Sequence, residues 1–305
     1  MGKLFKLITP LHQSTKRNYI ERMLNKKVDC MIESKKYAFN YWDGKRKYGY
    51  GGYKYIPGRW KKVAKNLIKK YKLNNNSKIL DVGCGSGLFS LAAFNMGANV
   101  FSFDFDVDSV ECTKQIRNRY AQDHSNWKIE QGSILDTDYL DRLNKFDIVY
   151  SWGVIHHTGD LWKSFSNLIG LVNCGGVLCV AIYNDQGIKS KVWTAIKKFY
   201  NQLPRFVRPS FAVVTFIGIQ VMSFLYHICK LKMISYLKNT KNYKSNRGMN
   251  LFNDWVDWVG GYPYEYASIK EFSELCQREN LVTVRVSPAI VPTGCNEFVF
   301  RREFD

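Results

Sequence analysis

From Lys78 onward, short apolar runs alternate with stretches in which apolar positions recur at helical spacing. This alternation is typical of chains that build a mostly parallel β-sheet covered by helices. Strands are expected where the apolar runs lie, at Lys78–Val82, Asn99–Asp104, Trp127–Gln131, Phe146–Ser151, Gly176–Tyr183, Leu281–Val286 and Asn296–Arg301. Helices are expected at Leu88–Met96, Val107–Tyr120 and Ile269–Glu279. The pattern therefore predicts an α/β fold with seven strands, of which the last two are close enough to form a hairpin.

Two segments lie outside this alternation and divide the chain. Residues 1–75 form a basic, Tyr-rich arm, and residues 186–267 interrupt the passage from the fifth strand to the last helix. The core is expected in two pieces, residues 76–185 and 268–305, with the interrupting segment as an inserted helical cap. No internal repeat with a period of about 20–50 residues is present.

The net charge of +19 is concentrated in two places. Residues 1–80 contain 21 Lys and Arg against 4 Asp and Glu, and residues 186–250 contain 12 against none. Such segments attract anionic partners such as a nucleotide sugar, a lipid headgroup surface or a nucleic acid. The alternative is a lysine-rich solvated surface that binds nothing.

The composition excludes several classes of protein. A chain of 305 residues with 46% hydrophobic residues builds a sizeable core, which excludes wholesale disorder. Eight cysteines without a C-x-x-C pair indicate neither a disulfide scaffold nor a zinc ribbon. The first twenty residues lack the apolar stretch of a secretory signal. We expect a reduced, cytoplasmic protein, with peripheral contact at the inner membrane as an alternative.

The first expected strand ends in a glycine-rich turn, Asp81-Val82-Gly83-Cys84-Gly85-Ser86-Gly87. Glycines at such a turn permit positive φ and let a ligand approach the backbone closely. The spacing is G-x-G-x-G rather than the G-x-G-x-x-G of dinucleotide-binding turns. Asp104 ends the second strand, where a carboxylate can accept hydrogen bonds from both hydroxyls of a ribose. Asp81 favours a cationic, amine-bearing ligand over a pyrophosphate, which it would repel.

At these residues the chain resembles the class I S-adenosylmethionine-dependent methyltransferases. The resemblance covers about residues 76–185 and 268–305, and it implies a Rossmann-like seven-stranded sheet whose last strand is antiparallel. It also implies that S-adenosyl-L-methionine is the cofactor and S-adenosyl-L-homocysteine the product. The residues assigned to the cofactor are Arg59, Asp81, Gly83, Gly85, Gly87, Asp104, Phe105, Ser133, Ile134, Ser151 and Trp152. In this assignment Asp104 holds the ribose, and Ser133 and Ile134 flank the adenine.

The fourth strand runs into the turn Trp152-Gly153-Val154-Ile155-His156-His157, which should face the transferred methyl group. This turn resembles that of ubiquinone-biosynthesis O-methyltransferases, which reads E-x-x-E-H and holds a divalent metal. Gly153 and His156 stand at the two carboxylate positions, so no metal site is expected here. His157 stands at the histidine position of that turn and is predicted to be the general base. His156 is a second catalytic candidate. The alternative for either histidine is helix capping or packing against the sheet.

Tyrosine, tryptophan and glycine crowd into residues 39–60 of the arm, with cations between them. This composition suits a flap that makes planar contacts with a ligand, and it makes Tyr50 and Tyr53 substrate candidates. Arg59 is placed to pair with the methionine carboxylate. The alternative is an aromatic lid that only covers the sheet edge. The segment also resembles uncharacterised bacterial methyltransferases that are often associated with surface-glycan synthesis.

Residues 211–229 are almost entirely apolar. Basic residues flank them on both sides: Arg205, Arg208, Lys230 and Lys232. A single membrane span is excluded because both ends must return to the same fold. We predict a buried cap helix and, from it, weak or no binding to anionic liposomes. The alternative is an in-plane membrane helix over residues 205–232.

Acidic and aromatic residues alternate between Asn253 and Glu265. Such a surface is one that sugar rings and hydroxyls prefer, and the alternative is a docking surface for the arm. The substrate candidates in this segment are Asp254, Asp257, Trp258, Tyr262 and Glu265.

These patterns predict an S-adenosylmethionine-dependent methyltransferase that modifies a hydroxyl of a small-molecule acceptor. The acceptor is expected to be anionic or glycan-related: a sugar, a nucleotide-linked or a lipid-linked intermediate. One alternative is a tRNA or rRNA methyltransferase, which the basic segments support. No recognised RNA-binding module or N/D-P-P-Y/F turn accompanies those segments. The other alternative is a non-catalytic, cofactor-binding partner subunit.

Overall fold

The structure is a computed structural model that describes residues 65, 74, 76–121, 124–234, 236–238, 240, 251–291 and 293–303. The arm residues predicted to contact ligands, Tyr50, Tyr53 and Arg59, lie outside the described residues. The fold below concerns the described part of the chain.

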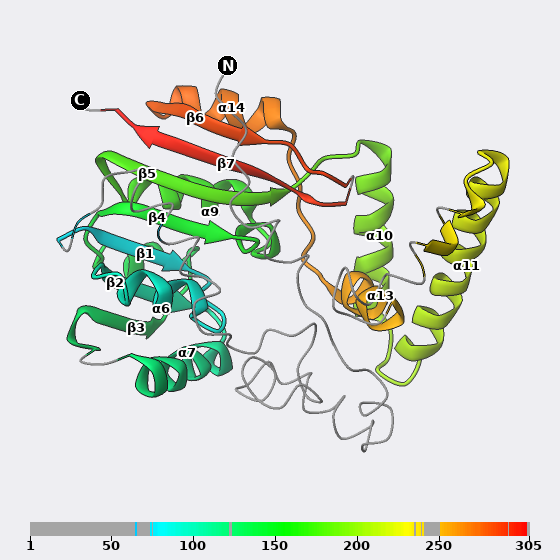
Figure 1. The fold of residues 1–305 in the computed structure, drawn as a ribbon, viewed down its shortest axis with the longest axis horizontal. Helices are drawn as coiled ribbons and strands as arrows, with labels where there is room; N and C mark the ends of the chain where they lie inside the picture. Colours follow the sequence, from blue (N-terminus) through cyan, green and yellow to red (C-terminus); the bar gives the residue numbers. More distant parts are fainter. Residues whose placement is uncertain are drawn as a thin grey trace.

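Seven strands form one sheet, in the order β3-β2-β1-β4-β5-β7-β6 (Figure 1). Their bounds are β1 (Lys78–Val82), β2 (Asn99–Asp104), β3 (Trp127–Gln131), β4 (Phe146–Trp152), β5 (Val172–Tyr183), β6 (Leu281–Ser287) and β7 (Cys295–Arg302). The first five strands of this order, β3, β2, β1, β4 and β5, pair in parallel, whereas β7 pairs antiparallel with both β5 and β6. The predicted seven-stranded α/β fold with an antiparallel last strand is confirmed.

Strand β5 begins at Val172, well before the predicted start at Gly176. Val172 pairs with Phe146, after which the register shifts and Val177 pairs with Ile148. Gly175 adopts a φ of 72° within this irregularity. A glycine pair that resembles a turn in the sequence is therefore a bulge that the strand passes through.

Helices cover both faces of the sheet. They are α6 (Leu88–Phe94), α7 (Val107–Tyr120), α8 (Thr137–Leu140), α9 (Leu161–Gly170) and α14 (Ile269–Arg278). Side chains from α9 and α14 pack in one buried core, and side chains from α6 and α7 pack in another on the opposite face. Alternate strand residues divide between the two cores, as Leu80 and Ile79 of β1 show. The strands are therefore buried on both faces, as parallel sheets usually are.

Between β5 and α14 the described residues also form α10 (Ile188–Gln202), α11 (Arg208–Cys229) and α13 (Leu251–Gly260). They share a small core of their own around Tyr200, Ala212 and Val259. In Figure 1 they extend beyond the carboxyl ends of the central strands, with α11 farthest from the sheet.

The prediction that residues 211–229 are buried is wrong. Ala212 is the only buried residue of α11, and only 6% of its most apolar 18-residue window is buried. The physical reason is that α10 and α13 pack on one side of α11, and a helix needs neighbours all round to be buried. Among the described residues, α11 is the one helix long and apolar enough to cross a membrane.

Candidate functional site

The glycine-rich turn after β1 lies against the turn after β4. Gly83 has a φ of 69°, and a Cβ atom at this position would lie 2.4 Å from Cγ1 of Val154. That distance is far below a normal carbon contact, and the β-branched Val154 side chain has little freedom to move away. Glycine at position 83 thus permits two turns at the carboxyl ends of the strands to meet, where ligands bind in open α/β sheets.

Asp104 is held at the same edge by backbone hydrogen bonds. Its Oδ2 accepts from the backbone N–H of Gly85 at 2.9 Å, and its Oδ1 accepts from the N–H of Asp106 at 3.0 Å. Burial raises the pKa of Asp104 above its ordinary value, and the two backbone donors counter this shift. Each carboxylate oxygen keeps a further lone pair, so the group can still accept two hydroxyls. Phe105, the next residue, exposes 77% of its surface at this edge.

Asp81 occupies a different environment. It is buried, and its Oδ2 accepts a hydrogen bond from Ser90 Oγ of α6 at 2.5 Å. Ser90 in turn contacts Ser102 Oγ at 2.7 Å, and Ser102 accepts from Trp127 Nε1 at 2.9 Å. Burial raises the pKa of Asp81 to about 7. Asp81 therefore anchors a buried polar chain beneath the turn, and its predicted contact with a ligand amine stays a prediction.

The remaining cofactor candidates divide into two groups. Ser133 and Trp152 are half-buried at the strand ends, and Trp152 stacks on Tyr150 with ring centroids 5.5 Å apart. Ile134 packs within the first core, and Ser151 is fully buried with no hydrogen-bond partner for its Oγ among the described residues. Ile134 and Ser151 are thus part of the interior beneath the carboxyl ends of the strands, whereas Ser133 and Trp152 are partly exposed at those ends.

His157 is held by a carbonyl from far along the chain. It lies at the end of a short 3-10 helix, Ile155–His157, that follows β4. Its Nδ1 lies 2.6 Å from the carbonyl oxygen of Pro263. Because a carbonyl only accepts, Nδ1 carries the proton and Nε2 keeps its lone pair. Burial lowers the pKa of His157, the bond to Pro263 opposes this shift, and nearby Lys197 lowers the pKa further, which favours the neutral ring.

His156 is buried in the protein and is not accessible to a ligand at the strand ends. Its ring is 1% exposed, and its Nδ1 accepts from the backbone N–H of Tyr183 at 3.3 Å. The ring centroids of His156 and Tyr183 are 4.0 Å apart. Burial lowers the pKa of His156 well below its ordinary value. His156 therefore joins the turn to the end of β5, and we keep the proposed base role for His157 alone.

The segment that returns from α13 docks on this turn. The N–H of Glu265 donates to the carbonyl of His156 at 3.0 Å. The Glu265 carboxylate accepts from the backbone N–H of Gly159 at 2.9 Å and of Leu161 at 3.0 Å, at the start of α9. The Glu265 carboxylate therefore caps the first turn of α9, and its predicted contact with substrate stays a prediction.

The sequence did not single out Lys197 of α10, which is buried beside the turn. Its Nζ donates to the carbonyl of Trp258 and lies 3.9 Å from the centroid of the Trp258 ring. It also lies 4.8 Å from the centroid of Tyr264. Burial lowers the pKa of Lys197 to about 7, and Asp257 opposes this shift. Nothing in a helix rich in lysine distinguishes this residue, because its environment comes from residues some 60 positions away.

The other predicted substrate residues of this segment have different exposures. Asp254 is buried and Trp258 is half-buried against Lys197, whereas Asp257 and Tyr262 are exposed. Among the described residues, no group of three or more His, Cys, Asp and Glu side chains is arranged to hold a metal ion.

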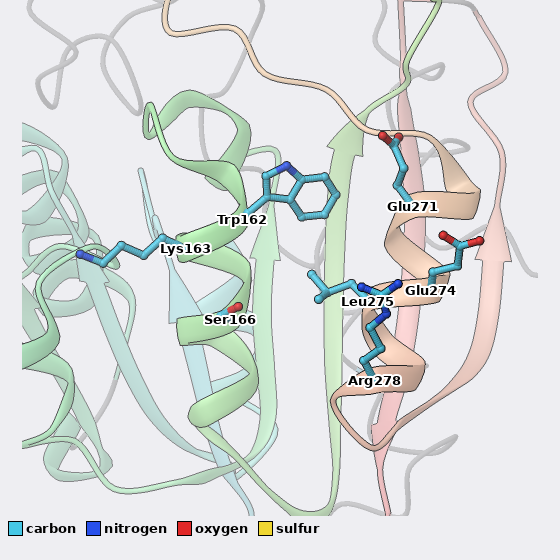
Figure 2. Close-up of a pocket in the computed structure, with 7 residues that line it drawn as sticks. All are labelled: Trp162, Lys163, Ser166, Glu271, Glu274, Leu275 and Arg278. Atoms are coloured by element: carbon cyan, nitrogen blue, oxygen red, sulfur yellow. The ribbon is translucent and has the colours of Figure 1, made fainter.

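One open hollow lies away from this edge. It has a volume of about 450 Å³ and lies between α9 and α14, where Figure 2 shows Trp162 directed toward the α14 side chains. Its lining residues are Trp162, Lys163, Ser166, Glu271, Glu274, Leu275 and Arg278. These residues lie on the outer faces of two helices, whereas ligands of this type of sheet bind at the carboxyl ends of the strands.

Comparison with known proteins identifies the family. Residues 73–227 match the family described as "Methyltransferase domain". The chain belongs to this methyltransferase family. Two similar proteins are both named ubiquinone biosynthesis O-methyltransferase. The one from Pelagibacter ubique is 26% identical over 190 residues, 57% of this chain and 76% of the relative. The one from Coxiella burnetii is 28% identical over 163 residues, 50% of this chain and 65% of the relative.

A solved structure shows the same fold. PKMT2 from Rickettsia typhi, in complex with AdoHcy, matches with a TM-score of 0.53 and 17% sequence identity. The match covers 79% of this chain and 52% of that chain. By family and fold, the chain thus belongs to the S-adenosylmethionine-dependent methyltransferases.

The residues at the strand ends fit that cofactor. The half-buried Asp104 carboxylate offers acceptors for ribose hydroxyls, and the exposed Phe105 ring lies next to it. Gly83, Gly85 and Gly87 all have positive φ, so this turn needs glycine and leaves its backbone open to close approach by a ligand.

Proposed function

We propose that this methyltransferase transfers a methyl group from S-adenosylmethionine to a hydroxyl of a small, polar acceptor, with His157 as general base. The acceptor class is a sugar or a nucleotide-linked or lipid-linked intermediate. The observation that carries the proposal is the 2.6 Å hydrogen bond between Nδ1 of His157 and the carbonyl of Pro263. The names of the two similar proteins, both O-methyltransferases, support the choice of a hydroxyl.

The chain's own residues have distinct tasks in this reaction. When bound, S-adenosylmethionine would supply an electrophilic methyl group, and the carbon–sulfur bond that breaks would leave the neutral thioether of S-adenosylhomocysteine. Asp104 would hold the ribose, and the turn at Gly83 to Gly87 would lie beside the methionine part. Methyl transfer then needs mainly alignment and exclusion of water, which a site at the edge of a rigid sheet can provide.

His157 removes the proton that an alcohol must lose. The proton passes from the acceptor hydroxyl to Nε2, as the oxygen forms its bond to the methyl carbon. The Pro263 carbonyl holds the ring orientation and stabilises the imidazolium that results, since Nδ1–H is already directed at it. The product is a neutral ether, and His157 afterwards releases its proton to solvent.

The pH dependence of catalysis should follow the lowered pKa of His157. Because the neutral imidazole is the base, kcat/KM should fall on the acid side with an apparent pKa below the ordinary value of 6.5. Lys197→Met removes a cation that opposes protonation of His157, so the acid limb should move to higher pH. Initial rates across a pH series would measure both curves. An acid limb above 6.5 in the unchanged enzyme would contradict this role.

The acceptor class can be tested with labelled cofactor. Purified protein and methyl-labelled S-adenosylmethionine would be incubated with three acceptor pools: nucleotide sugars, lipid-linked glycans and total RNA. We expect the label to enter the nucleotide sugars or the lipid-linked glycans. Analysis of the product should find the labelled methyl group in an ether. Incorporation into RNA alone would favour the nucleic-acid alternative. Cofactor binding without transfer to any pool would favour a non-catalytic partner subunit.

A further inference from the structure

Helix α11 exposes its apolar side chains and directs its polar ones toward the protein, which is the reverse of a surface helix in water. The exposed side chains between Val213 and Ile228 are all apolar: Val213, Val214, Ile217, Val221, Met222, Phe224, Leu225, Tyr226 and Ile228 expose between 42% and 67% of their surface. The polar residues of this stretch, Thr215, Gln220, Ser223 and His227, are all only partly exposed. A surface helix of a soluble protein shows the opposite arrangement.

The polar residues of α11 have partners on the protein side. Thr215 Oγ1 accepts from Nε1 of Trp255 on α13 at 3.2 Å, and Gln220 Oε1 accepts from the hydroxyl of Tyr236 at 3.5 Å. The ring of His227 bonds within the helix to the carbonyl of Ser223 at 2.7 Å, and its centroid lies 5.1 Å from that of Tyr236. The contacts with Trp255 and Tyr236 fix the rotation of the helix about its axis, so the apolar residues face outward.

The charge around this face identifies its partner. Residues 186–250 contain 12 Lys and Arg and no Asp or Glu. Arg205 precedes the helix, and Lys230, Lys232 and Lys238 follow it, all of them exposed. An apolar stripe with cations at both ends suits a bilayer that contains anionic lipids. A second copy of this chain would bring two sets of like charges together, which is unfavourable.

We propose that the outer face of α11 lies in the interface of an anionic lipid membrane. At 1.5 Å per residue its 22 residues extend over about 33 Å, with the basic residues placed at the level of the headgroups. This contact rests on the helix and its charges and does not depend on the proposed acceptor. This proposal corresponds to the in-plane membrane helix over residues 205–232 and replaces the predicted buried cap helix.

Vesicle sedimentation tests the contact directly. Full-length protein should sediment with vesicles of phosphatidylcholine and phosphatidylglycerol, much less with phosphatidylcholine alone, and less as salt is raised. Met222→Glu and Leu225→Glu should each lower the partition coefficient by about tenfold or more, because each removes one apolar side chain from the interface. Val282→Glu adds the same charge at an exposed position of β6 and should leave binding unchanged.

Circular dichroism and thermal unfolding of the variants would show that their fold is intact. Equal sedimentation with and without anionic lipid, or binding that survives both α11 substitutions, would overturn the proposal. Sedimentation equilibrium without lipid gives a further outcome. A dimer that Met222→Glu dissociates would show that a second copy covers this face, and would also overturn it.

Discussion

Replacing His157 with alanine is expected to lower kcat by about 10²–10⁴-fold, the usual effect of losing a general base. The affinity for S-adenosylmethionine should stay nearly unchanged, because Asp104 and the glycine-rich turn, which are proposed to hold the cofactor, follow β2 and β1 rather than β4. The reason for a large effect is that an alcohol is a poor nucleophile until its proton leaves. Single-turnover rates measure the chemistry, and calorimetry with the cofactor measures binding.

A matched variant separates the base from its anchor. His157→Asn keeps a donor near the position of Nδ1 and can still bond to the carbonyl of Pro263, but it has no basic nitrogen. It should be as slow as the alanine variant. If asparagine restored activity, His157 would be a positioning residue, and if alanine left the rate unchanged, a different group would accept the proton. Loss of cofactor affinity in both variants would make the residue structural.

Replacing Asp104 with alanine should weaken S-adenosylmethionine binding by about 1.5–3 kcal/mol, the range for hydrogen bonds to a charged group. Two losses combine here, since the carboxylate that would hold the ribose also accepts from the backbone of Gly85. Isothermal titration calorimetry with cofactor measures the change.

Asp106→Ala is the control for this measurement. Asp106 caps α7 by accepting from the N–H of Ser109 at 2.9 Å, so its loss should cost about 1 kcal/mol of unfolding free energy. The backbone N–H that supports Asp104 remains in this variant, and cofactor affinity should be unchanged. Unchanged affinity in the Asp104 variant would contradict the ribose assignment, and tight binding of NAD by the unchanged protein would contradict the cofactor itself.

The sequence predicted those features whose causes are local. The predicted bounds of β1, β2 and β3 agree with the structure to the residue, because polar residues or glycine lie at or next to the ends of each apolar run. The glycine turn and Asp104 were predicted from strand-end position and spacing alone, and the structure joins them by a hydrogen bond.

What the sequence missed depends on contacts between distant segments. The carbonyl that fixes the His157 tautomer comes from Pro263, 106 positions away, and a backbone oxygen has no signal in a sequence. In the sequence Lys197 resembles every other lysine of α10. Only the fold distinguishes it, because it places the rings of Trp258 and Tyr264 against its Nζ. For α11, apolar composition predicts burial, but composition does not say how many neighbours a helix has.

The segment that returns from α13 connects the inserted helices to the proposed general base and to the start of α9. Pro263 orients His157, and Glu265 binds the start of α9, within three residues of one another. A chimaera that exchanged residues 186–267 for the insertion of a related enzyme would remove both contacts together with α10, α11 and α13. Exchange of acceptor specificity by grafting should therefore succeed only when the graft ends before Tyr262, so that the recipient keeps its own Pro263 and Glu265.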